Sequence, residues 1–132
     1  MTDQPRALVL FAGGGGSTIG LEQAGFETLS VEVDPAACET LEAADLPWMC
    51  ADLSTEDVRN RIRALPGRWD LLWASPPCQI HSRANTTRRG RGVDGWPWTL
   101  ALVRDIRPPA MIVENVGGAP WDRWRADLEG LG

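Results

Sequence analysis

The sequence predicts an α/β fold in which a mostly parallel sheet carries helices on both faces. Short apolar runs alternate with amphipathic stretches along the 132 residues, and continuous apolar runs are typical of strands buried on both faces. Glycine and proline residues separate the runs. The length suits one domain with its own hydrophobic core, and we expect residues 1–132 to form it.

The first fifty residues contain three of the expected strands. Gly25 stops the first helix, whereas Asp34 is a suitable N-cap for the second and Pro35 suits its first turn. In order, we expect a strand over 7–11, a helix over 17–24, a strand over 27–33, a helix over 35–44 and a short strand over 48–50.

The rest of the chain continues the alternation around one irregular stretch, residues 75–95. Pro66-Gly67 and Pro108-Pro109 mark breaks. In order, we expect a helix capped by Ser54 or Thr55 and ending near Arg63, a strand over 70–74, a helix over 96–106, a strand over 110–113 and a helix over 120–128.

Five polar or conformationally special residues follow the predicted strands. They are Gly13, Glu32, Asp52, Cys78 and Glu114, one for each strand in turn. Because ligands in parallel sheets bind at the carboxyl ends of the strands, we expect these residues to share one edge of the sheet.

The glycine-rich loop between the first strand and the first helix predicts a cofactor site. Glycines let the backbone approach a ligand closely, and Glu32 follows Gly13 at the spacing of a carboxylate that binds a ribose diol. The spacing suits an adenosine-type cofactor, and a nicotinamide enzyme would show it too. A plain glycine-rich turn is the alternative, although four consecutive glycines have an entropic cost that a turn does not require.

The Pro76-Pro77-Cys78 segment predicts a cysteine nucleophile, because two prolines stiffen the backbone before the thiol. Neighbouring arginines would favour the reactive thiolate. A small buried apolar cysteine is the alternative. A Cys78–His81 protease pair would leave the glycine loop unexplained, and we expect His81 only to line the loop.

Glu114 follows the apolar run 111–113, which predicts partial desolvation of its carboxyl group. Desolvation would raise the pKa of that group and make it a proton donor near neutrality. An edge glutamate in water is the alternative.

The remaining cysteines, Cys38 and Cys50, are expected to act as small apolar residues. The count is odd and no C-x-x-C pair occurs, so we expect neither a structural disulfide nor a metal site, and a reducing cytoplasm. The N-terminus does not look like a signal peptide, and no apolar run of membrane-spanning length occurs.

The charge is divided unevenly along the chain. Residues 1–60 hold eleven acidic and two basic side chains, whereas residues 61–132 hold seven acidic and eleven basic ones. Nucleic acid, if bound, should therefore meet the second half.

Taken together, the motifs resemble those of the DNA cytosine-5 methyltransferases. Residues 11–16 resemble the first motif of that family, Glu32 the second, Asp52 the third, Pro77-Cys78-Gln79 the fourth and Glu114-Asn115-Val116 the sixth. The resemblance implies a Rossmann-like methyltransferase fold, incomplete at the C-terminus, that binds S-adenosyl-L-methionine and double-stranded DNA.

The resemblance also implies roles for individual residues. Cys78 would attack C6 of a flipped-out cytosine and Glu114 would stabilise charge at N3, while C5 accepts the methyl group. The implied cofactor contacts are Phe11 and Asp52 at the adenine, Glu32 at the ribose, Gly13 and Gly15 at the methionine, and also Leu53. The implied substrate and DNA loop contains Gln79, Ser82, Arg83, Arg88, Arg89 and Arg91, with Asn115 expected to brace it.

The family pattern continues beyond Gly132 with further strands and a target-recognition region. We therefore expect a catalytic fragment, a subunit completed by a second polypeptide or a decayed relative. A non-catalytic module that binds the cofactor or a partner is the alternative. A role in DNA methylation and restriction–modification fits the resemblance, and the target sequence stays open.

Overall fold

A computed structural model describes residues 3–77 and 93–132 of the chain. Five parallel strands form one sheet in the order β3-β2-β1-β4-β5. The strands are β1 (Arg6–Leu10), β2 (Glu27–Glu32), β3 (Trp48–Cys50), β4 (Leu71–Ala74) and β5 (Ala110–Val113). The helices are α1 (Gly16–Gln23), α2 (Pro35–Ala43), α3 (Glu56–Arg63), α4 (Trp96–Ile106) and α5 (Trp121–Glu129). The predicted α/β fold is confirmed.

Two helix starts follow directly from local sequence. Asp34 accepts a hydrogen bond from the backbone N–H of Ala36 at 3.1 Å, as predicted for the N-cap of α2. Thr55, rather than Ser54, caps α3 by accepting from the N–H of Val58 at 3.4 Å. These caps fix where each helix leaves the carboxyl edge of the sheet.

The central strand β1 pairs with β2 on one side and with β4 on the other. The strand order therefore reverses at β1. The chain first adds β2 and β3 on one side of β1 and then adds β4 and β5 on the other side. A crevice at the carboxyl ends of the strands is the usual ligand site at such a switch point. The glycine loop follows β1 at this place.

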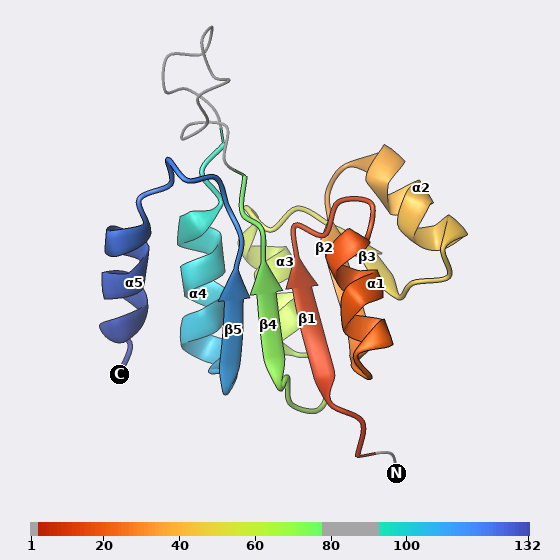
Figure 1. Ribbon diagram of the computed structural model, residues 1–132, viewed down its shortest axis with the longest axis horizontal. Coiled ribbons are helices and arrows are strands. Elements are labelled where there is room, and N and C mark those ends of the chain that lie inside the picture. Colours follow the sequence, from red (N-terminus) through yellow and green to blue (C-terminus); the bar gives the residue numbers. More distant parts are fainter. Residues whose placement is uncertain (1–2, 78–92) are drawn as a thin grey trace, which may run out of the picture.

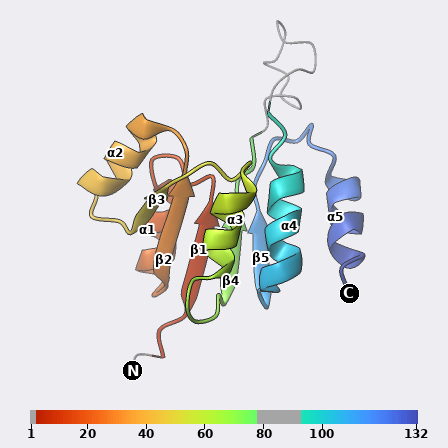
Figure 2. The same ribbon diagram turned by 180° about the vertical axis from the view of Figure 1, so that it is seen from behind.

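Helices cover the two faces of the sheet unequally. Figures 1 and 2 show α3 and α4 against one face and α1 against the other. Leu8 and Leu10 of β1 pack on the α3–α4 side with Leu102, whereas Val9 packs on the α1 side with Leu21. This alternation buries β1 on both faces, as its continuous apolar sequence predicts.

The α1 face of the sheet is open over β4 and β5 in the described part of the chain, as Figure 1 shows. Ile112 of β5 is 42% exposed there, beside the partly buried Trp73 of β4. Met111 and Val113 point to the opposite face, where α4 and α5 cover them. This uncovered apolar strip is a candidate contact surface.

One prediction was wrong: Cys38 of α2 and Cys50 of β3 form a disulfide, with their Cα atoms 5.9 Å apart. The residues are separated by twelve positions, and the packing of α2 beside β3 brings them together. Neither the odd number of cysteines nor the lack of a C-x-x-C motif gives information about cysteines that the fold brings together. These two criteria therefore could not reveal the Cys38–Cys50 bond.

Among the described residues, no helix combines the length and apolar character needed to cross a membrane. The same residues contain no cluster of three or more side chains suited to holding a metal ion.

Candidate functional site

A cavity of about 340 Å³ opens at the carboxyl edge of β1, β2 and β3. Most of its lining residues are apolar, and Glu32 and Asp52 are the charged ones. Its lining residues are Phe11, Val31, Glu32, Val33, Ala51, Asp52, Leu53, Ser54, Pro77, Val93 and Trp98. Four of the six predicted cofactor residues are therefore brought together in one cavity.

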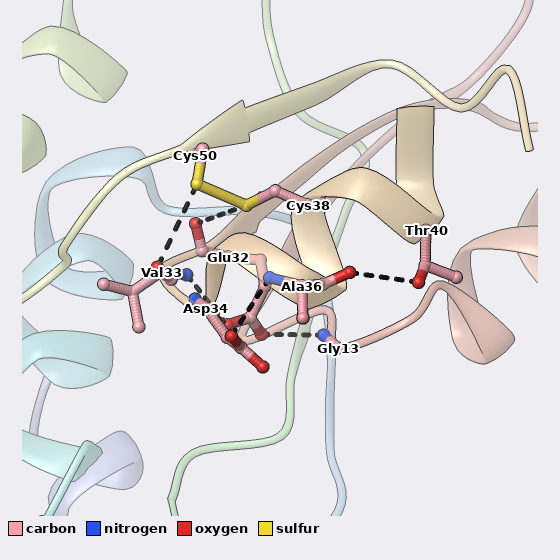
Figure 3. The surroundings of a disulfide bond; sticks show 8 residues. All are labelled: Gly13, Glu32, Val33, Asp34, Ala36, Cys38, Thr40 and Cys50. Carbon is pink, nitrogen blue, oxygen red and sulfur yellow. Dashed lines mark hydrogen bonds between the residues drawn. A yellow bond between two sulfur atoms is a disulfide. The ribbon is translucent and has the colours of Figure 1, made fainter. Parts of the chain in front are cut away.

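Glu32, at the end of β2, is held in place by three backbone N–H groups. Its Oε1 accepts a hydrogen bond from Gly13 at 2.8 Å, and its Oε2 accepts from Val33 and Asp34 at 2.8 Å each. Figure 3 shows the carboxylate between the glycine loop and the start of α2. Hydrogen bonds from fixed N–H groups set the direction of the carboxylate before any ligand arrives.

Asp52 is the second acidic residue of the cavity and lies two residues beyond the end of β3. Its Oδ1 accepts a hydrogen bond from the backbone N–H of Ser54 at 2.9 Å. Hydrogen bonds from the Ser54 side chain and backbone hold the pKa of Asp52 below its usual value of 3.8, so the carboxylate is charged at neutral pH. The site therefore presents a fixed negative charge at this wall.

Several apolar lining residues come from other parts of the chain. Phe11 follows β1 with a positive φ of 56°, a conformation that a non-glycine residue rarely adopts. Trp98, on the first turn of α4, also lines the cavity, as do Pro77 and Val93. Aromatic and aliphatic side chains together with two carboxylates suit a ligand with a flat ring and hydroxyl groups.

The two predicted glycines have different structural roles. Gly13 uses its N–H to hold Glu32 and has a φ of 58°. Gly15 also has a positive φ, and a Cβ there would lie 2.7 Å from Leu46 and 2.9 Å from Leu41. Gly15 is thus required by packing against the α2 region. Neither glycine lines the cavity.

The Glu114-Asn115 segment lies at the carboxyl end of β5. The amide Nδ2 of Asn115 donates to the carbonyl oxygen of Pro76 at 2.8 Å, and its Oδ1 accepts from the N–H of Val116 at 2.9 Å. The backbone N–H of Glu114 donates to Ala74 at 3.0 Å. These bonds tie the end of β5 to the chain that leaves β4.

Glu114 itself is exposed in the described structure, whereas the sequence predicted partial desolvation. Its strand is at the edge of the sheet, where no neighbouring strand of the described chain covers it. An apolar run before the residue was therefore a poor guide to its burial.

Several predicted site residues lie outside the described residues. They are Cys78, Gln79, Ser82, Arg83, Arg88, Arg89 and Arg91, together with His81. Pro77 immediately precedes Cys78 in the chain and lines the cavity.

Sequence reasoning missed part of the cavity wall, above all Trp98, Val93 and Ser54. Trp98 lies in α4, a helix for which the sequence predicted no site residue. Val93 belongs to the stretch predicted to be irregular. Only the fold places them beside Phe11, and no local pattern in the sequence marks them.

The parallel sheet, the glycine loop and the carboxylate after β2 define a Rossmann-like domain of the methyltransferase class. A TehB-like S-adenosylmethionine-dependent methyltransferase from Corynebacterium glutamicum has the same fold, with a TM-score of 0.67 and 16% identity, and the match covers 100% of this chain and 67% of that one. A tRNA (uracil-54, C5)-methyltransferase from Pyrococcus abyssi matches with a TM-score of 0.61 and 16% identity, over 97% of this chain and 29% of that one.

The family model of the C-5 cytosine-specific DNA methylases matches residues 6–123, and the chain therefore belongs to this family. The type II methyltransferase M.AquIA from Picosynechococcus sp. is 33% identical over 93% of this chain and 53% of its own length. The type II methyltransferase M.PspPI from Psychrobacter sp. is 36% identical over 83% of this chain and 26% of its own length. The chain thus spans about half, or less, of these relatives.

Proposed function

We propose that this chain supplies the cofactor site and nucleophile of a DNA cytosine-5 methyltransferase, which transfers a methyl group from S-adenosyl-L-methionine to C5 of cytosine. The observation that carries the proposal is the cavity that joins Glu32 and Asp52 to Pro77, the residue before Cys78. A cofactor held there would lie beside the start of the predicted nucleophile loop. Family membership and the methyltransferase-type fold support the same conclusion.

The residues of the cavity fit an S-adenosyl group. Glu32 accepts hydrogen bonds from the ribose hydroxyls, and Asp52 accepts one from the adenine amino group. Phe11 and Leu53 would contact the adenine ring, and Gly13 and Gly15, which do not line the cavity themselves, would adjoin the methionine part. A volume of about 340 Å³ falls within the range usual for small-molecule sites. When bound, the cofactor supplies a methyl group on a sulfonium centre.

The reaction begins with a covalent bond between the Cys78 sulfur and C6 of a cytosine flipped out of the duplex. Glu114 donates a hydrogen bond at N3 and stabilises the charge that develops there. C5 then becomes nucleophilic enough to accept the methyl group. S-adenosylhomocysteine is the leaving group of this transfer. Passage of the C5 proton to solvent water and departure of the Cys78 thiolate then restore the aromatic ring.

The DNA contacts of this proposal come from the second half of the chain, which carries the positive charge. Arginine side chains suit phosphate contacts. The proposed contacts are Gln79, Ser82, Arg83, Arg88, Arg89 and Arg91, with Asn115 as a brace. The named relatives are type II methyltransferases, so we propose a cytoplasmic role in DNA methylation within restriction–modification.

The test is covalent trapping on double-stranded DNA that contains 5-fluorocytosine, with S-adenosyl-L-methionine present and Cys78→Ser as the control. Fluorine at C5 cannot leave as a proton does, so the adduct persists. We expect a protein–DNA adduct that Cys78→Ser abolishes. An adduct that survives the substitution would exclude Cys78 as the nucleophile. Glu32→Gln should weaken cofactor binding at least about tenfold, because it removes the charge and turns an amide NH2 toward a backbone N–H that donates to the carboxylate in the wild-type protein.

A second candidate is a subunit that binds the cofactor but needs a second polypeptide for methyl transfer. The exposed strip at Trp73 and Ile112 favours it, because an apolar edge of this kind is usually covered. Calorimetric binding of S-adenosylhomocysteine without any trapped adduct would support this candidate. An adduct formed by the chain alone would contradict it.

A further inference from the structure

The Cys38–Cys50 disulfide lies directly behind the acidic wall of the cavity. Cys50 is the residue of β3 that pairs in register with Glu32 of β2. Cys38 comes from α2, which begins at Pro35 just beyond the turn that holds the Glu32 carboxylate. Figure 3 shows the two sulfurs beside Glu32 and Val33, on the side away from Gly13.

The elements that the disulfide joins have few other attachments. β3 is a three-residue strand at the edge of the sheet, and within the described parts of the chain it pairs with β2 alone. Among the nine residues of α2, only Cys38 and Leu41 are buried. A covalent bond between two weakly held elements restricts their relative movement more than it would in a packed core.

Both elements position residues of the cavity. Asp52 follows Cys50 by two residues, and the backbone N–H of Ala51 donates to the carbonyl oxygen of Glu32 at 2.8 Å. The N–H groups of Val33 and Asp34, at the entry to α2, hold the Glu32 carboxylate. Movement of β3 relative to α2 would therefore change the spacing between the two acidic groups.

The surroundings also suit the reduced state. The Cys38 sulfur lies 3.5 Å from the carbonyl oxygen of Glu32, and the Cys50 sulfur lies 4.0 Å from that of Val33. A thiol at either position has an acceptor within reach. Cys50 is exposed, whereas Cys38 is only 4% exposed, so a reagent in solution would meet Cys50 first.

We propose that Cys38 and Cys50 form a reversible thiol–disulfide pair that controls the affinity of the cofactor cavity, with the oxidised form binding more tightly. This inference rests on the proposed function of the cavity. The oxidised pair fixes the spacing of Glu32 and Asp52 before binding, so less ordering is left for the ligand to impose.

Oxidation of the Cys38 and Cys50 thiols to the disulfide requires an oxidant, and a low-molecular-weight disulfide can serve as one. The Cys50 thiolate attacks one sulfur of that disulfide and expels one thiolate, which leaves a mixed disulfide on Cys50. The Cys38 thiolate then attacks the Cys50 sulfur and expels the second thiolate. Two protein thiols are oxidised, the small disulfide is reduced to two thiols, and the two protons pass to the expelled thiolates. A small dithiol reverses the sequence.

The experiment uses the full chain with Cys78→Ser, so that only Cys38 and Cys50 can respond. The protein is equilibrated with oxidised glutathione or with reduced dithiothreitol, the Cys38–Cys50 bond is assessed by peptide mass spectrometry, and the Kd for S-adenosylhomocysteine is measured by calorimetry. We expect a Kd at least about fivefold lower in the oxidised protein, the lower end of usual coupling between sites. Cys50→Ser, at an exposed position, should remove the redox dependence and keep the Kd of the reduced protein.

Equal Kd values in both states, with the Cys38–Cys50 bond formed and broken as intended, would overturn the proposal and leave the cofactor site intact. Absence of that bond in the oxidised protein would also overturn it. Absence of S-adenosylhomocysteine binding in both states would instead overturn the proposed function on which the inference depends. Cys38→Ala gives a second variant and should match Cys50→Ser in binding.

Discussion

The side-chain amide of Asn115 donates a hydrogen bond to the carbonyl oxygen of Pro76 over 2.8 Å, although the two residues are 39 positions apart. Pro76 is buried and stands two residues before Cys78. The bond therefore fixes the start of the predicted nucleophile loop to the end of β5, beside Glu114. We therefore expect Asn115 to act as a positioning residue for that loop.

Asn115→Asp should lower the rate of adduct formation on 5-fluorocytosine DNA without changing cofactor affinity. Aspartate keeps the acceptor for the Val116 N–H but loses the donor to Pro76, and a buried carbonyl without a partner costs about 1–3 kcal/mol. The free energy of unfolding should fall by a similar amount. Asn60→Asp, on the exposed face of α3, is the matched control and should change neither quantity. An unchanged rate of adduct formation in Asn115→Asp would show that Asn115 does not position the predicted nucleophile loop.

Gly95→Ala should destabilise the protein by about 1–3 kcal/mol through steric overlap. A Cβ at this position would lie 2.9 Å from the Phe11 ring and 3.1 Å from Pro76, and it would also overlap Pro77. The backbone of Gly95 has a φ of −85°, which alanine adopts freely, so backbone strain is not involved. Equilibrium unfolding in urea measures the loss.

Gly20→Ala is the control for this substitution and should have the opposite sign. Gly20 is an exposed residue inside α1, and a Cβ there meets no atom within 4 Å. Alanine in a helix interior is favoured over glycine by about 0.5–1 kcal/mol. If Gly95→Ala proved as harmless as Gly20→Ala, the close contact between the start of α4 and Pro77 would not exist in solution.

Local sequence predicted the ten helices and strands of the described residues to within one residue at each end. The reason is physical: buried parallel strands are continuous apolar runs, and helix starts carry their own signals, as at Asp34 and Thr55. The carboxyl-edge rule then brought Glu32 and Asp52 to one cavity, because strands β2 and β3 end at the same side.

What local sequence could not supply was contact between distant segments. The Cys38–Cys50 bond depends on how α2 packs beside β3, and the cavity wall at Trp98 depends on the direction in which α4 begins. The exposure of Glu114 depends on the edge position of β5. In each case the deciding factor is the arrangement of elements, and periodicity carries no information about it.

Trp98→Ala should raise the Kd for S-adenosylhomocysteine about tenfold, because an aromatic contact beyond simple burial contributes about 0.5–1.5 kcal/mol. Trp98 and Phe11 are the two aromatic residues that line the cavity, so loss of the Trp98 ring removes one of its two aromatic contacts. Trp98→Phe should retain most of the affinity. Trp48→Ala, at a residue 38% exposed on β3 and outside the cavity wall, should have no comparable effect. Calorimetry on all three variants distinguishes a ligand contact from a general packing role.

Asp70 should contribute stability at neutral pH that is lost in acid. Its Oδ2 accepts a hydrogen bond from the backbone N–H of Arg6 at 2.9 Å, and its Oδ1 accepts one from the Arg68 guanidinium. These two partners, the Arg6 N–H first, hold the pKa of Asp70 below its usual value of 3.8. Because the folded-state pKa is lowered, the stabilisation is complete above the unfolded value and disappears as the pH falls through the folded value.

The difference in thermal midpoint between the wild-type protein and Asp70→Asn should therefore be largest near neutral pH and shrink below about pH 4. Asparagine keeps an acceptor for the Arg6 N–H but has no charge to lose, so its own midpoint should depend less on pH. Arg68→Gln removes only the second partner and should give an intermediate dependence, because the Arg6 N–H still lowers the pKa of Asp70. A midpoint difference that stays constant from pH 7 to below pH 4 would show that the Arg6 and Arg68 contacts do not favour the charged carboxylate.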